Sequence, residues 1–282
     1  MITIAAVTVL EIVRRRFAVA AVCATLAIVA LSGWGFGNLE HIHRAHGRPL
    51  TPLEIKAIAS VLVILIVYLF SFVLAVAAVL LAAPTLAAEV DSGVLLPVLA
   101  RPISHAAIVM GKAIGLATAL CCYAGVAGLV ELTIVRTITG YVPPHPVSAV
   151  AALATLGLVV LALALAVSTR LQTIATSIIA VAAFGLSWMA GIVASFASIY
   201  HDPWLVRAGV ISQLLLPSDA MWRIAIYQLE PAILVNQAQA SGQWQGPFFV
   251  TAPPPPAMEV WTLLWIIAVM FIAIRSFSTR DA

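Results

Sequence analysis

Six long apolar segments dominate the pattern of hydrophobic and polar positions along the chain. A helix that spans a bilayer needs about 20 predominantly apolar residues, and most of these segments reach that length. They cover residues 17–36, 57–83, 106–130, 147–167, 174–199 and 260–274. The pattern therefore predicts an all-α polytopic membrane protein with six transmembrane helices, organised as a single domain over residues 1–282.

The polar connections divide this domain further. Residues 1–16 carry apolar side chains at helical spacing, including Ile4 and Val7, which predicts an interfacial helix at the membrane surface. Residues 84–105 form a polar segment between the second and third spans, and residues 200–258 form the largest loop. A cleaved secretory leader is an alternative interpretation of the N-terminus, but an apolar stretch precedes its arginines, which is atypical of leaders.

Composition supports the membrane class. Hydrophobic residues make up 63% of the chain and charged residues 9%, whereas about a quarter of the residues in an ordinary soluble domain are charged. The net charge of +3 gives no case for nucleic-acid binding. Cys23, Cys121 and Cys122 all lie inside apolar runs, so no disulfide framework or cysteine metal site is indicated.

The basic residues of the loops predict cytoplasmic N- and C-termini. With six spans, the inner set is Arg14, Arg15, Arg16, Arg101, Lys112, Arg170, Arg275 and Arg280. The outer set is Arg44, Arg48, Lys56, Arg136, Arg207 and Arg223. The inner set is only slightly larger than the outer set. However, the positive-inside rule gives most weight to short loops and to the first helix, which Arg14 to Arg16 directly precede. On this orientation residues 84–105 are cytoplasmic and residues 200–258 are extracytoplasmic.

The stretch from Glu89 to Lys112 is the most informative part of the sequence because it is a polar island in an apolar chain. Gly111-Lys112 suggests a phosphate-binding loop, but such a loop needs glycine at position 106 and Ser or Thr after the lysine. Alanine stands at both Ala106 and Ala113. We therefore expect no nucleotide hydrolysis by this chain and no cofactor bound to it.

The same stretch resembles the ABC-2 family of exporter permeases, in which an acid, Ser-Gly, a leucine-rich turn, Ala-Arg-Pro and Gly-Lys recur in this order. The matching residues are Glu89, Ser92, Gly93, Leu95, Leu99, Ala100, Arg101, Pro102, Ser104, Gly111 and Lys112. Val94 and His105 depart from the family pattern without removing the Gly turn or Arg-Pro. The six-span layout, Glu11 with its arginines, and residues 216–223 extend the resemblance.

The resemblance implies a cytoplasmic coupling helix that docks on a separate ATPase subunit. Its residues would be Glu89, Asp91, Gly93, Leu95, Leu96, Leu99, Arg101 and Pro102. Gly93 permits a sharp reversal, the leucines form an apolar ridge, and Pro102 ends the helix. The alternative to a coupling helix is a loop at the membrane surface whose charges lie among the lipid headgroups. The implied partners are two ATPase copies that carry ATP and Mg, a second permease copy or paralogue, and lipid of a prokaryotic plasma membrane.

Glu131 is the candidate for a substrate path, because an acid at bilayer depth usually faces a bundle interior or a cavity. An interfacial position beside Arg136 is the alternative. His41, His43 and His46 are weak metal candidates, and plain loop histidines are the favoured interpretation, since neither a second acid nor a cysteine completes a site. Asp219 is expected to cap a short helix.

The sequence therefore predicts the permease subunit of an ATP-driven exporter for a hydrophobic or lipid-like cargo. A stand-alone secondary carrier or channel is the first alternative, although such proteins usually carry more polar residues within their spans. A subunit that transmits motion without moving cargo is another. A membrane enzyme is disfavoured, because the cytoplasmic side shows no acidic pair or histidine motif at catalytic spacing.

Overall fold

The regular structure of this protein is helical. The computed structural model describes residues 2–14, 16–37, 52–91, 104–196, 203–231, 235–236, 249–250, 252 and 254–279. Within these residues there is no strand, and six helices are long and apolar enough to cross a membrane. The predicted fold class and number of spans are confirmed.

The six spans lie in helices whose bounds follow the apolar segments closely. These helices are α2 (Arg16–Gly37), α4 (Pro52–Asp91), α6 (His105–Thr139), α7 (Pro146–Ser168), α8 (Thr173–Ser195) and α13 (Ala257–Ser278). The shorter helices are α1 (Ile2–Arg14), α10 (Pro203–Leu215) and α11 (Ser218–Leu229). Helix α1 covers the predicted interfacial segment, while α10 and α11 belong to the largest loop and are separated at Leu216 and Pro217.

Two helices are longer than their apolar runs. Helix α4 has 40 residues and α6 has 35, which correspond to about 60 and 50 Å at 1.5 Å per residue, against a hydrocarbon core of about 30 Å. The third apolar run ends at residue 130, but α6 continues to Thr139 and stops at Gly140, whose φ of 66° is left-handed. Glycine adopts this conformation without a steric penalty.

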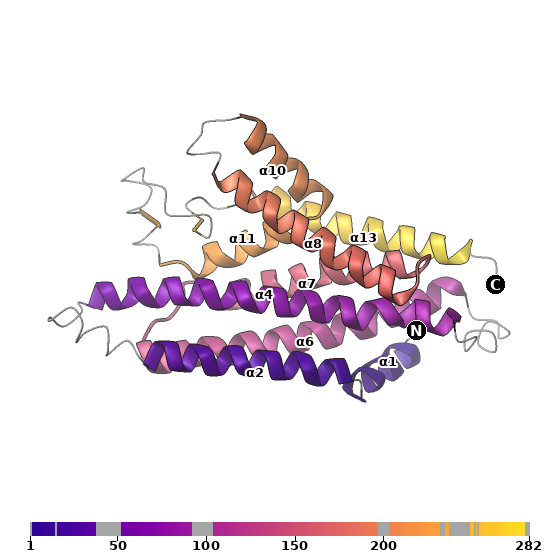
Figure 1. Ribbon diagram of the computed structural model, residues 1–282, viewed down its shortest axis with the longest axis horizontal. Helices are drawn as coiled ribbons and strands as arrows, with labels where there is room; N and C mark the ends of the chain where they lie inside the picture. The colour runs from indigo at the N-terminus through magenta and orange to yellow at the C-terminus, as the bar shows by residue number, and fades with distance from the viewer. Residues whose placement is uncertain are drawn as a thin grey trace.

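Helix α7 is the central helix of the bundle (Figure 1). It packs against α4, α6, α8, α11 and α13, and 61% of its span is buried, against 17% for α13. At Gly157 a side chain would meet Leu74 of α4 and Leu120 of α6 at 3.2 and 3.0 Å. Glycine therefore lets α7 approach both neighbours closely.

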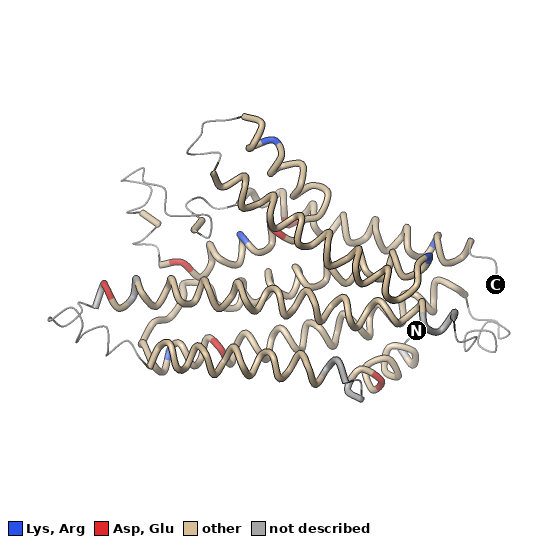
Figure 2. The backbone as a smooth tube through the Cα atoms, in the orientation of Figure 1, with Lys and Arg blue, Asp and Glu red and all other residues tan. Residues whose placement is uncertain are grey.

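The two termini lie at the same end of the elongated bundle (Figure 1), as an even number of spans requires. Charged residues are sparse along its length (Figure 2). Side chains such as Leu263, Ile267 and Phe271 of α13 are exposed, and their exposure suits contact with lipid tails.

Helix α1 packs against the first half of α6. A side chain at Gly115 would place its Cβ 2.7 Å from the Ala5 carbonyl oxygen and 2.9 Å from the Thr8 Cβ. The Thr8 hydroxyl donates to the Ile4 carbonyl at 2.9 Å, so its polar group is satisfied within α1. The contact depends on the absence of a side chain at Gly115.

Gly115→Ala is expected to lower the free energy of unfolding by about 1–3 kcal/mol, the usual cost of overpacking a close contact. Gly125→Ala is the matched control on the same helix, because nothing lies within 4 Å of its Cβ position. It should be neutral or slightly stabilising. Thermal unfolding in detergent measures both, and equal melting temperatures for the two variants would contradict the α1–α6 contact.

Candidate functional site

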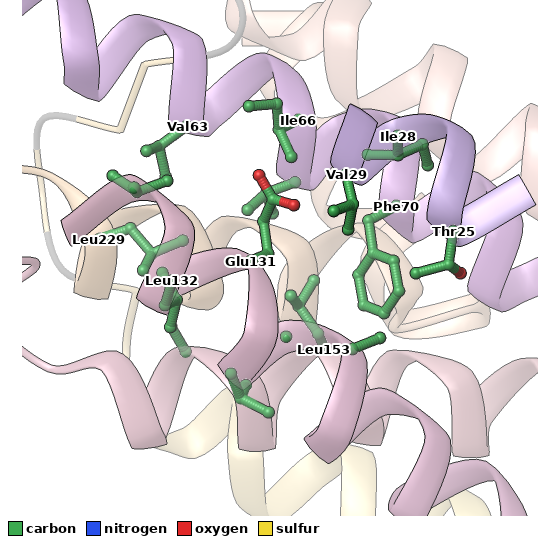
Figure 3. A pocket seen from close by; sticks show the side chains of 16 residues that line it. Thr25, Ile28, Val29, Val63, Ile66, Phe70, Glu131, Leu132, Leu153 and Leu229 are labelled. Carbon is green, nitrogen blue, oxygen red and sulfur yellow. The ribbon is translucent and has the colours of Figure 1, made fainter. Parts of the chain in front are cut away.

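A small apolar cavity of about 30 Å³ lies between α2, α4, α6 and α7, enough space for a water molecule or two. Val63, Ile66 and Phe70 line it from α4, and Leu153 lines it from α7. Figure 3 shows these side chains around Glu131, which enters from α6. This volume is well below the range of about 300–1,000 Å³ that is typical of small-molecule sites.

Glu131 is the acidic residue of this cavity. Its carboxylate lies close to Ile66 and Val29 (Figure 3), and both of its oxygens are buried without a hydrogen-bond partner. An unpaired carboxylate in apolar surroundings is costly, so such groups usually serve a function or meet a partner that the isolated chain does not supply.

Arg136 does not neutralise Glu131. Arg136 is exposed, and no ion pair joins it to Glu131 among the described residues. Five residues along an α-helix correspond to a rotation of about 140°, so the two side chains leave α6 in different directions. Of the two sequence-based interpretations, the structure favours the one in which Glu131 faces a cavity.

The other polar groups near the cavity are already satisfied. The Thr25 hydroxyl donates to the Ala21 carbonyl at 3.0 Å and is hydrogen-bonded to the Tyr123 hydroxyl. The Ser32 hydroxyl, about two turns further along α2 and beside Glu131, donates to the Val29 carbonyl at 2.9 Å. Glu131 is therefore the polar side chain of the cavity lining that retains unused hydrogen-bonding capacity.

A second buried acid lies next to the cavity, outside the six candidate spans. Glu230 directly follows Leu229, which lines the cavity, and only 2% of Glu230 is exposed. The Val250 backbone N–H donates to its Oε1 at 3.0 Å, while Oε2 has no partner. Burial raises the pKa of Glu230 to about 8, against the lowering effect of the Val250 hydrogen bond. Burial and the nearby Glu230 also raise the pKa of Tyr141.

Asp219 has a different role from the one expected. The N-cap position of α11 is Pro217, and no side chain caps the helix there, so the prediction that Asp219 is a capping residue is wrong. Its Oδ2 instead accepts hydrogen bonds from Gln213 at 2.9 Å and Arg223 at 2.8 Å. Arg223 also donates to the Gly191 carbonyl at 2.6 Å, so the pair joins α8, α10 and α11. An arginine within reach, four residues later, outcompetes the helix N-terminus for the carboxylate.

Much of the predicted coupling helix lies outside the described residues. Gly93, Leu95, Leu96, Leu99, Arg101 and Pro102 fall there, whereas Glu89 and Asp91 belong to the last turn of α4. On the other side of this segment, Ser104 caps α6 by accepting a hydrogen bond from the Ala107 N–H at 3.2 Å.

Lys112 joins α6 to the part of α4 that forms the start of the coupling segment. It is 8% exposed, and its Nζ donates to the Thr85 carbonyl of α4 at 2.9 Å. Pro84, the residue before Thr85, has no backbone N–H. The carbonyl four residues earlier in α4 therefore lacks its usual helical donor. The Gly-Lys motif singled out Lys112 in the sequence, but the motif did not indicate that this side chain contacts another helix.

His41, His43 and His46 also lie outside the described residues. Among the residues that the structure does describe, no group of three or more His, Cys, Asp or Glu side chains could hold a metal ion. Sequence reasoning missed Glu230, whose one signal was an isolated acid between two apolar stretches of the largest loop.

Comparison with known proteins identifies one family. The sequence profile described as ABC-2 family transporter protein matches residues 3–282, nearly the whole chain. No curated protein matches the chain.

The raised pKa of Glu230 predicts that the stability of the folded chain depends on pH. Because its pKa is raised by folding, the unfolded chain releases this proton near its ordinary pKa of 4.5, and the folded chain near about 8. Stability should therefore fall as the pH rises through this window. Glu230→Gln, which keeps an acceptor for Val250, should flatten the dependence of the melting temperature on pH. The slope should survive in Glu259→Gln, which removes an exposed carboxylate of α13. An unchanged slope in Glu230→Gln would contradict the assignment.

Proposed function

Because the chain belongs to the ABC-2 family of transporter membrane proteins, we propose that it is the permease subunit of an exporter with a hydrophobic or lipid-like cargo. Subunits of this family are non-catalytic, and the family implies an ATPase partner. ATP and Mg would bind that partner.

The proposed docking element is the coupling segment, residues 84–105. Leu95, Leu96 and Leu99 would fill an apolar groove on the ATPase, where well-packed anchors carry most of the binding energy. The surrounding charges would form ion pairs at the rim, with Gly93 allowing the reversal and Pro102 ending the helix. These charges are Glu89, Asp91 and Arg101.

One observation supports this proposal most. The two helices that flank the coupling segment, α4 and α6, are also the helices that supply most of the cavity lining. Val63 and Phe70 belong to α4, and Glu131 belongs to α6. A displacement of the coupling segment would therefore act on two walls of the cavity through continuous helices.

The contact between Lys112 and the Thr85 carbonyl gives this transmission a physical basis. A buried lysine that donates to a carbonyl of another helix resists separation of the two, because separation would leave a charge in apolar surroundings. We infer that α4 and α6 move together at this end of the bundle, so that a push on the segment shifts both.

The proposed assembly contains two permease copies, or a close paralogue pair, and two ATPase chains in a prokaryotic plasma membrane. Both termini would be cytoplasmic. Their location at one end of the bundle agrees with this proposal (Figure 1), and so does the cluster of arginines before the first span.

Leu95→Asp combined with Leu99→Asp is expected to abolish copurification of the ATPase from membranes of the source organism. Each aspartate would place an unpaired charge in the proposed apolar contact, and losses of more than 2 kcal/mol per anchor are typical of such positions. Affinity purification of the tagged chain followed by an ATPase assay is the measurement.

Leu214→Asp combined with Leu215→Asp is the matched control. These leucines are exposed on α10, in the loop that the charge distribution predicts to be extracytoplasmic, so ATPase binding should persist. Retained ATPase in the Leu95 and Leu99 double variant would refute the docking assignment. A wild-type chain that brings down no ATPase would refute the coupling proposal.

A further inference from the structure

A pair of arginines lies at the end of the bundle where α13 ends. Arg170 follows α7 in the turn to α8, and Arg275 belongs to the last turn of α13. Figure 2 shows basic positions at this end of the bundle, close to the C-terminus. We propose that the two arginines, together with exposed apolar side chains beside them, form a binding site for an anionic phospholipid of the surrounding membrane. This site is separate from the coupling segment and needs no ATPase.

The structure brings the two charges together. The Arg170 Nε donates to the Ser276 hydroxyl at 2.8 Å, and its Nη2 donates to the Thr279 hydroxyl at 2.6 Å. Thr279 lies four residues after Arg275, and its backbone N–H donates to the Arg275 carbonyl. Residues at this spacing are neighbours on a helix surface. The Arg170 guanidinium therefore lies against the face of α13 from which Arg275 projects.

No acid neutralises this pair within the described part of the chain. Both side-chain contacts of Arg170 are to neutral hydroxyls, and neither arginine forms an ion pair with another described residue. The sequence has no Asp or Glu between Glu131 and Asp202, and none between Glu259 and Asp281. Like charges that are held close together repel one another, so an anion shared by the two arginines would stabilise this arrangement.

The geometry of Arg170 suits phosphate. A guanidinium group binds phosphate oxygens through pairs of parallel N–H bonds. The Nε and Nη2 atoms of Arg170 are directed at Ser276 and Thr279, which leaves Nη1 for a ligand. Ser276 is also hydrogen-bonded to Thr169 at 2.9 Å, so the residues that orient the guanidinium are themselves held in place. An arginine that is oriented in advance loses less entropy when it binds.

The apolar neighbours of the pair favour a lipid over a soluble anion. Phe271 lies four residues before Arg275, on the same face of α13, and Ile174 lies in the first turn of α8, four residues after Arg170. Both apolar side chains are exposed. A phospholipid presents the same order, with a charged headgroup above its acyl chains. The loop charges predict that this end is cytoplasmic, where basic pockets between spans bind acidic headgroups.

The test is lipid binding to the purified full chain in detergent, with native mass spectrometry used to measure the dissociation constant of the first bound lipid. Dioleoylphosphatidylglycerol is the anionic probe. Dioleoylphosphatidylcholine is the matched probe, because it has the same acyl chains and a phosphate but no net charge. The wild type should bind phosphatidylglycerol about ten- to fiftyfold more tightly, the range expected for two basic residues near a membrane surface.

Three variants identify the contact. Arg170→Gln combined with Arg275→Gln should reduce the affinity for phosphatidylglycerol to about that for phosphatidylcholine. Arg136→Gln combined with Arg207→Gln is the matched control, because it removes the same amount of charge from exposed positions of α6 and α10. This control should keep the wild-type preference. Arg275→Gln alone should weaken phosphatidylglycerol binding about fivefold.

Glycerol 3-phosphate separates a lipid site from a site for soluble phosphate, because it carries the phosphate without the acyl chains. Present at the same concentration as phosphatidylglycerol, it should leave the bound lipid in place. Displacement of the lipid by glycerol 3-phosphate would overturn the inference in favour of a soluble ligand.

Other results would also overturn the inference. These are equal affinity of the wild type for the two lipids, or equal losses of phosphatidylglycerol affinity in the two double variants. If the Arg170 and Arg275 double variant does not fold, Arg275→Gln decides the question, because the Arg275 side chain has no hydrogen bond or ion pair with another described residue. Undiminished phosphatidylglycerol affinity in Arg275→Gln would then refute the site.

Discussion

The hydrocarbon of a bilayer offers no hydrogen bonds, so each polar group within this bundle must find its partner in the protein. The buried hydroxyls follow this rule by donating to nearby carbonyls, as Thr25 and Thr85 do within their own helices. Charged groups follow it across helices, as in the contacts of Arg223 with the Gly191 carbonyl and of Lys112 with the Thr85 carbonyl. Against this background, the unpartnered oxygens of Glu131 are an exception that calls for a functional explanation.

The fold was largely predictable because membrane spans are read from a simple physical requirement, about 20 apolar residues in succession. The predicted ends of the helices were less accurate where the apolar side chains stop before the helical backbone does. The apolar run that ends at residue 130 lies in a helix that continues to Thr139, because backbone hydrogen bonds do not require apolar side chains. In the largest loop, Pro217 separates α10 from α11.

The candidate site was predictable only in part. Glu131 was identified because a lone acid in an apolar run is conspicuous, but the rest of its cavity consists mainly of ordinary apolar residues from five helices. A residue such as Val63 or Leu153 carries no sign of this role, since it depends on which helices become neighbours. The same limitation applies to Asp219, where a helix cap and an ion pair were both compatible with the local sequence and tertiary contacts selected the pair.

The packing of α1 against Gly115 has a consequence for biogenesis. A chain is synthesised from its N-terminus, whereas the surface on which α1 rests belongs to α6, roughly a hundred residues later in the sequence. During translation α1 therefore lacks its main packing surface until the third span enters the membrane. Its exposed Val7 and Leu10 would keep it on the lipid surface in the meantime, so that docking of the first helix becomes a late step of assembly.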